Sequence, residues 1–465
     1  MKISKQFRLS ISFILCKYLQ IGCLLILLSC SKDTATPVEK ITPVEKIIPY
    51  HGVHIKSEAI VNGYTDKFSY SSNDTVSVYI NSKDSVKNAV VKLFSADGLI
   101  VDSTMVNIFP QNIKNPNPWE NGYGYEVTLR YSPQKLKSGI YFWENKISMI
   151  VKSSDPKDIT VLYPSNTDNA YCLSGGLSMY SLPEYARIVS FLRPILNIQF
   201  SISFLKWINQ SEFNNSINYI SDIDLDNELT LSNTKLLIII GHSEYWTRKA
   251  RMFVDQFVEQ GHNMLVLSGN TMWWQVRYNS TNDQLICYKS QKEDPIPDLL
   301  LKTTNWCESV VKYPIFNSIG CDFTLGGYGL KTDTGWDGFK ICSDNSPLLA
   351  GTNLKKGDIL KLPSSEYDGT YIKGFDKDGY PIIDNSTLKF HKSEIIGFDI
   401  GFRDKPTCGT FFAFQKNQTS GKVINTATTD WCAPNGIGGK DGDKIKIITR
   451  NMISILLNGA EIFSK

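Results

Sequence analysis

Five consecutive apolar residues, two leucines followed by three isoleucines at positions 236–240, constrain the fold of this chain most strongly. A strand without a polar position is buried on both faces, which is typical of a parallel sheet covered by helices. The run ends at Gly241, and residues 247–259 have helical periodicity. The polar residues 242–245 therefore fall on a turn at the carboxyl end of a strand, the edge at which open α/β sheets bind ligands.

The alternation of strands and helices around this turn predicts the fold of residues 156–465. Further strands are expected at 159–164, 218–221 and 264–269, and helices at 204–210, 248–260 and 451–457. This β-α-β order predicts a doubly wound α/β domain of flavodoxin or glutamine-amidotransferase type, with β-rich insertions in the later part.

Residues 47–155 have a different pattern. Short alternating runs at 76–80, 89–94, 125–129 and 140–143 are separated by turn residues such as Asp97-Gly98. Their spacing predicts an all-β immunoglobulin-like sandwich that precedes the α/β domain. Nothing in this part indicates catalysis.

The first 46 residues have the features of an export signal and a tether. The apolar segment 21–28 follows several basic residues and is too short to span a bilayer. Leu-Leu-Ser-Cys at 27–30 is similar to a bacterial lipobox, in which Cys30 takes the lipid. We therefore expect a lipoprotein signal peptide at 1–30, a flexible proline-rich tether at 31–46 and an exported protein anchored to a membrane. An uncleaved anchor, or a plain signal with an incidental cysteine, is the alternative.

Composition narrows the classes of function. Hydrophobic residues make up 42% of the 465 residues, enough for a large core and two or more domains. The net charge of +3 gives no case for nucleic-acid binding. The chain has no Cys-x-x-Cys pair, which argues against a zinc ribbon or a thioredoxin-like site. Whether the chain forms a homo-oligomer stays open.

The side chains of the turn allow two kinds of chemistry. A nucleophile elbow needs a glycine two residues after its serine, and Tyr245 stands there after Ser243. Serine catalysis is therefore disfavoured. His242, Glu244 and Tyr245 together offer an imidazole, a carboxylate and a phenol, and phenolates bind hard trivalent ions well. The alternative is that the Tyr-Trp pair only packs.

Several motifs occur in one order between about residue 138 and the C-terminus. Gly-His-Ser-Glu-Tyr-Trp-Thr at 241–247 is one of them, and the others lie at 161–171, 175–180, 193–197, 222–225, 269–277 and 428–431. With these motifs, about two-thirds of the chain resembles the large (β) subunit family of N,N-dimethylformamidase. The resemblance implies an amidotransferase-like α/β domain that holds a mononuclear ferric ion with two tyrosines and one glutamate. In such a site the ion activates an amide or water.

Two of these three ligands match residues of this chain. Tyr245 matches one tyrosine and Glu366 matches the glutamate. The segment expected to carry the other tyrosine contains Ser203 and Phe204 instead. Either Tyr180 or Tyr171 replaces it, or the ion is different, or the metal site is lost.

Other polar and aromatic residues of the motifs are candidates for the reaction. We expect His242, Glu244 and Asp430 to be catalytic, as an oxyanion donor or proton carriers. The candidates for substrate binding are Asn169, Asn270, Trp273 and Trp431. The alternatives are turn caps for the asparagines and Asp430, and the core for the tryptophans.

These observations lead to two hypotheses from different classes. The first is an exported, lipid-anchored, metal-dependent hydrolase of the C–N bond of a linear amide, with a small-molecule or glycan- or peptide-derived substrate. The second is a non-catalytic surface protein that keeps the fold and binds glycans or peptides.

Overall fold

The computed structural model describes residues 51–196, 198–329 and 336–464. The expected signal peptide at 1–30 with Cys30, and the tether at 31–46, lie outside the described residues. Within the described ranges, no helix is both long and apolar enough to cross a membrane.

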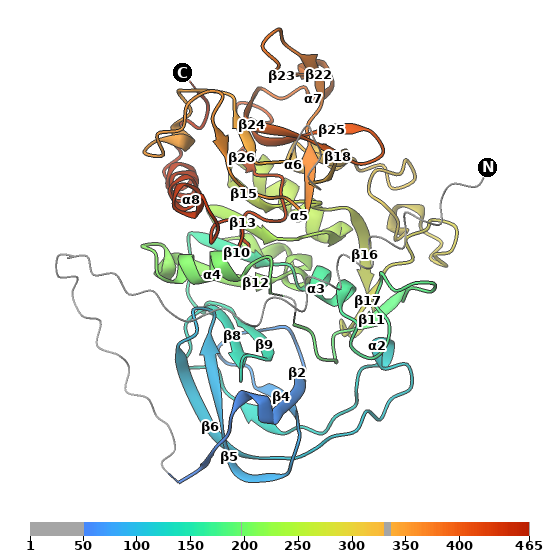
Figure 1. The fold of residues 1–465 in the computed structure, drawn as a ribbon. Helices are drawn as coiled ribbons and strands as arrows, with labels where there is room; N and C mark the ends of the chain where they lie inside the picture. Colours follow the sequence, from blue (N-terminus) through green and yellow to red (C-terminus); the bar gives the residue numbers. More distant parts are fainter. Residues whose placement is uncertain (1–50, 197, 330–335, 465) are drawn as a thin grey trace, which may run out of the picture. The chain divides into compact units, whose positions relative to one another are not determined.

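Two sheets form the first β-rich part of the chain (Figure 1). Six strands make one sheet: β1 (Val53–His54), β5 (Val86–Ser95), β8 (Gly139–Trp143), β9 (Ile147–Val151) and β3 (Ser69–Tyr70) in this order, with β6 (Ile100–Ile108) paired to β5. The second sheet contains β2 (Ile60–Thr65), β4 (Val76–Ser82) and β7 (Leu129–Tyr131). Val78 of β4 shares one buried cluster with Leu93 and Trp143 of the larger sheet.

Three of the four strands expected in this part are confirmed by β4, β5 and β8. The strand expected at 125–129 is wrong, because regular pairing starts only at Leu129. Tyr125 packs instead against Tyr64 and Tyr123, with ring centroids 5.7 and 5.3 Å apart. The alternating pattern there reflects an aromatic cluster rather than a strand.

The largest sheet has eleven strands and mixed direction. Its parallel strands are β12 (Ile217–Ser221), β10 (Ile159–Tyr163), β13 (Leu236–Gly241), β15 (Asn263–Ser268) and β26 (Lys422–Asn425). The order continues with antiparallel strands β25 (Pro406–Gln415), β24 (Lys392–Phe402), β18 (Asp322–Tyr328) and β21 (Glu366–Gly369), and β19 (Phe339–Ile341) and β20 (Ile359–Leu360) branch from β24. The strands expected at 159–164, 218–221, 236–240 and 264–269 are confirmed by β10, β12, β13 and β15.

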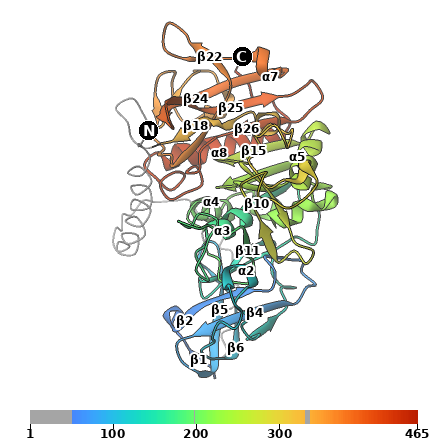
Figure 2. The ribbon, with the colours of Figure 1, turned by 90° about the vertical axis from the view of Figure 1, so that its right-hand side faces the viewer.

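The isoleucine-rich strand β13 is buried on both faces, as its sequence predicts. Leu237 and Ile239 pack in one cluster with residues of α5 (Arg248–Glu259). Ile238 and Ile240 point to the other face and join a cluster with α4 (Ile202–Asn209) and α8 (Gly442–Leu457). Figures 1 and 2 show α5 and α8 on opposite sides of this part of the sheet.

The expectation of a doubly wound domain of flavodoxin or glutamine-amidotransferase type is wrong. Of the residues that the structure describes, 33% lie in strands and 19% in helices. Of the described helices, only α4, α5 and α8 have eight or more residues. In the described residues between β15 and β26, the chain forms strands, turns and helices of at most four residues, and none of these is a long crossover helix. Hydrophobic runs predict single strands well, but they do not reveal that about half of the strands of this sheet pair in antiparallel direction.

Smaller elements complete the described fold. A four-stranded sheet contains β11 (Ile188–Ser190), β17 (Gln284–Ile286), β16 (Trp274–Tyr278) and β14 (Tyr245–Thr247), and β22 (Ile372–Phe375) pairs with β23 (Pro381–Ile383). The short helices are α2 (Pro118–Asn121), α3 (Ser165–Tyr171), α6 (Phe316–Ile319) and α7 (Asn385–Leu388). The 3₁₀ turn η3 (Asp222–Asp226) follows β12.

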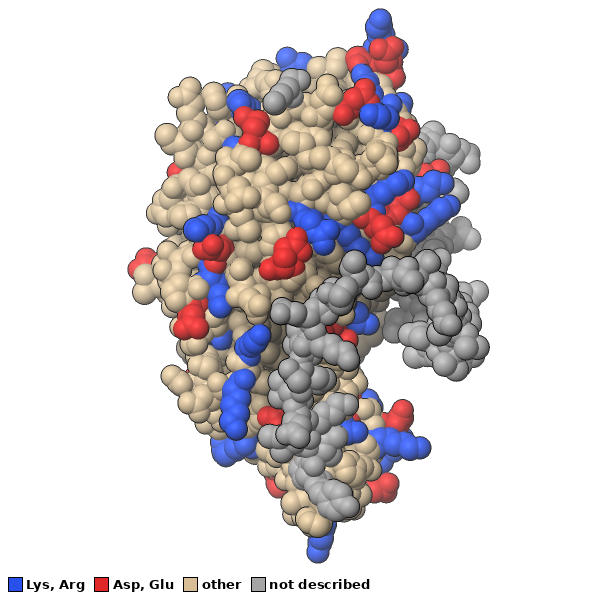
Figure 3. Space-filling view, turned by 90° about the vertical axis from the view of Figure 1, so that its left-hand side faces the viewer, with Lys and Arg blue, Asp and Glu red and all other residues tan. Residues whose placement is uncertain are grey.

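Charges of both signs lie on the surface. On the face drawn in Figure 3, lysine and arginine side chains have aspartate and glutamate side chains among them. This mixture agrees with the near balance of 49 basic and 46 acidic residues.

A buried carboxyl group at the start of η3 makes the stability of the protein depend on pH. Asp222 accepts hydrogen bonds from the Asn166 amide at 2.8 Å and from Ser165 Oγ at 3.1 Å, and burial raises its pKa to about 7. Since the pKa is near 4 in an unfolded chain, the stabilisation is complete below about pH 4 and is lost as the pH rises through 7.

We expect Asp222→Asn to remove this loss, because the amide is neutral at every pH and its oxygen still accepts from Asn166. When the pH rises from 5 to 8, the free energy of unfolding should fall by about 2–4 kcal/mol more in wild type than in the variant. Urea unfolding at the two pH values measures the difference. Equal pH dependence of both proteins would contradict the assignment.

Candidate functional site

Polar side chains meet at the carboxyl edge of three neighbouring parallel strands. Strand β10 leads into α3, β13 into the turn that starts at His242, and β15 into the loop with Asn270. β13 ends at Gly241 with a φ of +75°, and a Cβ atom there would lie 2.5 Å from Ser201 Oγ. Only glycine allows this reversal. The prediction that residues 242–245 form a turn at the carboxyl end of a sheet strand is confirmed for 242–244, whereas Tyr245 begins the short strand β14.

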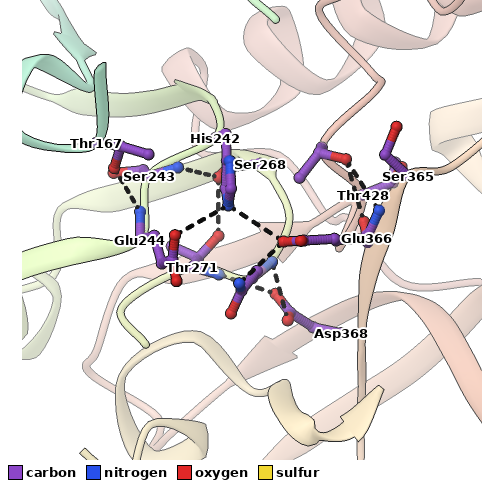
Figure 4. Close-up of polar contacts among 12 residues, drawn as sticks. Thr167, His242, Ser243, Glu244, Ser268, Thr271, Ser365, Glu366, Asp368 and Thr428 are labelled. Atoms are coloured by element: carbon purple, nitrogen blue, oxygen red, sulfur yellow. Dashed lines mark hydrogen bonds and ion pairs between the residues drawn. The ribbon is translucent and has the colours of Figure 1, made fainter. Parts of the chain in front are cut away.

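His242 lies between two glutamates that are 122 positions apart in the sequence (Figure 4). Its Nε2 atom is 3.5 Å from Glu244 Oε2 and 3.3 Å from Glu366 Oε2. His242 and Glu244 are buried, whereas 21% of the Glu366 side chain is exposed. Asn270 Nδ2 donates to Glu366 Oε2 at 2.9 Å. The structure thus brings together four residues that sequence reasoning proposed.

The electrostatics of this group follow from burial and from its opposite charges. Burial alone would lower the pKa of His242, but the carboxylates of Glu366 and Glu244 outweigh it and raise the pKa to about 9. Burial raises the pKa of Glu244. Burial also opposes ionisation of Glu366, yet the hydrogen bond and the charge of His242 lower its pKa. The group therefore favours an imidazolium beside an ionised Glu366.

Glu366 is held by the segment that follows β26. Its carbonyl accepts from the Thr429 amide at 3.1 Å, and Tyr367 forms an isolated β-bridge with Thr428. The buried carboxylate of Asp430 accepts from the Ser365 amide at 2.6 Å and from Asn435 Nδ2 at 2.8 Å. Asp430, expected as a proton carrier, fixes the residue next to Glu366 and has its acceptors occupied.

Three tyrosines lie near Glu244, and one of them contacts the carboxylate oxygen that does not face His242. Tyr180 Oη donates to Glu244 Oε1 at 2.5 Å, and its ring stacks on Tyr171 with centroids 4.2 Å apart. The Tyr245 ring is edge-on to Tyr180 at 6.4 Å and is fully buried. Tyr180 is 40% exposed, so its ring reaches the surface while its hydroxyl points inward. Tyr245 Oη and Glu244 Oε2 are buried without a hydrogen-bond partner among the described residues.

Lys289 adds a positive charge that no sequence pattern indicated. Its Nζ lies 3.4 Å from the centroid of the Tyr180 ring and 5.0 Å from that of Trp274. It also donates to the Met179 carbonyl at 2.9 Å. Burial lowers the pKa of Lys289, while the nearby carboxylate of Glu244 opposes this. A lone lysine in a polar loop gives no signal by which sequence analysis could find it.

The residues predicted to bind substrate, other than Asn270, lie outside the group around His242. Asn169 Oδ1 accepts from Arg193 Nη2 at 3.0 Å, while its buried Nδ2 has no partner among the described residues. Trp273 is half-buried and packs on Phe323 at 5.2 Å. Trp431, expected to bind substrate, is completely buried, and its indole donates to Thr449 Oγ1 at 3.0 Å. It belongs to the core and offers no surface to a substrate.

The tyrosine hydroxyls offer ligand oxygen atoms for the ferric ion that the resemblance implies. Phe204, in the segment expected to carry the second tyrosine, is a core residue. No three His, Cys, Asp or Glu side chains in the described ranges form a group that could hold a metal, so a cation here depends on phenol oxygens. The unpartnered oxygens of Tyr245 and Glu244, with Tyr180 beside both, make a set of two phenols and one carboxylate. This set fits a hard trivalent cation.

Comparison with known proteins gives one family. Residues 105–435 match the family described as N,N-dimethylformamidase beta subunit-like, C-terminal. The match covers well over half of the chain. No curated protein matches the chain at a significant level.

Solved structures resemble the chain only distantly. A beta-galactosidase from Bacillus circulans sp. alkalophilus aligns with 66% of this chain and 32% of its own, at 12% identity and a TM-score of 0.33. A ThuA-like protein from Bacteroides uniformis aligns with 67% of this chain and 96% of its own, at 11% identity and a TM-score of 0.33. The chain thus spans about a third of the first of these proteins, and likenesses at these scores carry no argument about function.

Proposed function

This chain belongs to the N,N-dimethylformamidase beta subunit-like family, and from this premise we propose that it hydrolyses the C–N bond of a linear amide. One observation supports the proposal most: an imidazole held between two glutamates beside a cluster of phenols. Solvent reaches this group, because 21% of the Glu366 side chain and 40% of Tyr180 are exposed. Buried polar groups that remain unpaired next to an accessible carboxylate are typical of reaction sites rather than of packing.

The geometry gives Glu366 and His242 separate tasks. Asn270 holds one oxygen of Glu366, and the carboxylate accepts a proton from the water that attacks the carbonyl carbon. His242 donates from Nε2 to the developing oxyanion or to the leaving nitrogen. The Glu244 carboxylate, 3.5 Å from the same nitrogen, stabilises the positive charge of the imidazolium. The C–N bond breaks, the nitrogen leaves as a protonated amine, and water supplies the new oxygen of the acid.

Tyr245, Tyr180 and Glu244 would hold the ferric ion. When bound, such an ion polarises a carbonyl or acidifies water. The buried ring of Tyr245 and the stacking of Tyr180 on Tyr171 fix both phenols before any ion binds. Glu366 matches the family's glutamate, but its contacts are with His242 and Asn270.

The activity is tested with a panel of linear amides that includes N-substituted formamides, N-acyl amino acids and N-acetylated amino sugars. The full chain, with and without added ferric ion, is expected to release amine and acid from at least one class, measured by proton NMR. Binding of a panel member without release of amine from any of them would favour the non-catalytic surface protein that binds glycans or peptides.

We also propose that the protein is exported and anchored by a lipid on Cys30. The lipobox-like Leu-Leu-Ser-Cys at 27–30 and the tether that follows support this location. An exported site fits a glycan- or peptide-derived amide as substrate. Labelling with a radioactive fatty acid tests the anchor, and equal label in wild type and Cys30→Ser would contradict it.

A further inference from the structure

Exposed aromatic rings lie next to Glu366 in the sheet. Tyr328 of β18 is directly opposite Glu366 of β21 and also opposite Phe402 of β24. Residues opposite each other across antiparallel strands have neighbouring side chains on one face. Tyr328 is 38% exposed and Phe402 is 41% exposed. The accessible carboxylate of the site therefore continues into an aromatic surface.

Arg403 follows Phe402 and lies on the half-buried ring of Trp273 and on the buried ring of Phe323. Its guanidinium carbon is 5.2 Å from the centroid of the Trp273 ring and 4.8 Å from that of Phe323. Nη1 donates to the Phe323 carbonyl at 2.8 Å, and the described residues provide no other hydrogen-bond partner for this side chain. The rings and this single bond fix the guanidinium while most of its donors stay free.

These residues form a continuous path to the site. We call Trp273, Phe323, Tyr328 and Arg403 the aromatic platform. Trp273 is in edge contact with Phe323 at 5.2 Å, and Phe323 with Tyr328 at 5.8 Å. Trp273 also contacts Trp274 at 6.1 Å, and Trp274 Nε1 donates to Tyr180 Oη at 3.4 Å. Tyr180 in turn donates to Glu244.

We propose that the aromatic platform binds a carboxylate of the substrate, so that the amide hydrolysed is of the N-acyl amino acid class. The inference rests on the proposed amide hydrolysis. A guanidinium with free donors pairs with a carboxylate through two parallel hydrogen bonds. The exposed ring of Tyr328 and the half-buried ring of Trp273 cover the apolar side chain of such a substrate, and the scissile amide then lies toward Glu366 and His242. A small neutral amide would leave the platform unused.

Two matched probes test the proposal: N-acetyl-L-phenylalanine and its neutral primary amide, N-acetyl-L-phenylalaninamide. Titration of the full chain, followed by tryptophan fluorescence, should show the acid binding about tenfold or more tightly than the neutral probe. In Arg403→Gln, affinity for the acid should fall by a similar factor while affinity for the neutral probe stays the same. Arg403→Lys keeps the positive charge but cannot form two parallel hydrogen bonds with a carboxylate. Its affinity for the acid should lie between those of wild type and Arg403→Gln.

Arg187→Gln is the matched control, because Arg187 is an exposed arginine paired with Glu293 at 2.6 Å. It should bind both probes as wild type does. Equal affinity of wild type for the two probes, no change in both Arg403 variants, or no binding of either probe would each overturn the platform proposal.

Acetate release from both probes is measured on the same samples. Release without preference for the acid overturns the platform and leaves amide hydrolysis in place. Tighter binding of the acid, without hydrolysis of any amide tested, supports the platform and overturns the proposed function. The two proposals therefore fail separately.

Discussion

Replacing Glu366 by Gln is expected to lower kcat/KM for amide hydrolysis by about 10²- to 10⁴-fold, the range for loss of a general base. The amide cannot accept the proton of the attacking water. Its oxygen can still accept from Asn270 Nδ2, so the local structure is kept. Steady-state amine release measures the effect, and thermal unfolding checks that the variant is folded.

Glu293→Gln provides the comparison for this change. Glu293 is an exposed partner of Arg187, and its neutralisation should leave kcat/KM within about twofold of wild type, because surface ion pairs contribute little. A kcat/KM of Glu366→Gln within threefold of wild type would rule out Glu366 as the base.

The purified chain loaded with ferric ion is expected to bind one equivalent of iron and to show a visible absorption band from phenolate-to-iron charge transfer. Tyr245→Phe should remove most of this band, and Tyr180→Phe should weaken and shift it. The Tyr180 hydroxyl donates to Glu244, and the Tyr245 ring lies edge-on to Tyr180. A phenylalanine ring fills the same space without a ligand oxygen. Visible absorption and elemental analysis of the same samples measure the change.

Tyr185→Phe is the control, since Tyr185 is a nearby tyrosine whose hydroxyl donates to the Tyr288 carbonyl at 3.1 Å. Its spectrum should match that of wild type. An unchanged band in Tyr180→Phe together with a lost band in Tyr171→Phe would assign the second phenol to Tyr171. A colourless, iron-free wild type would contradict ferric binding altogether.

Much of the parallel half of the main sheet was predictable from the sequence. Buried strands such as β13 carry an uninterrupted apolar pattern, and α5 ends before Gly261 as its sequence predicts. The antiparallel half was not predictable, because alternating residues do not say which strand pairs with which. The doubly wound topology failed for this reason.

The candidate site was predictable where a motif carried the residues. His242, Glu244, Asn270 and Glu366 come together as the motifs implied. Tyr180, one of the two phenols considered for the missing tyrosine of the family pattern, donates to Glu244. Lys289 and Arg403 have no local signal, since their importance depends on rings supplied by distant segments. The case of Trp431 shows that a tryptophan within a motif can serve packing alone.

The isolated β-bridge between Tyr367 and Thr428 joins the two halves of the main sheet next to Glu366. Glu244 follows a strand of the parallel half, whereas Glu366 begins the last strand of the antiparallel half. The distance between Glu244 and Glu366 across His242 therefore depends on how the second half of the sheet packs against the first. A slight separation of the two halves there would move Glu366 away from His242 and abolish the proposed hydrolysis, while the hydrophobic core stayed intact.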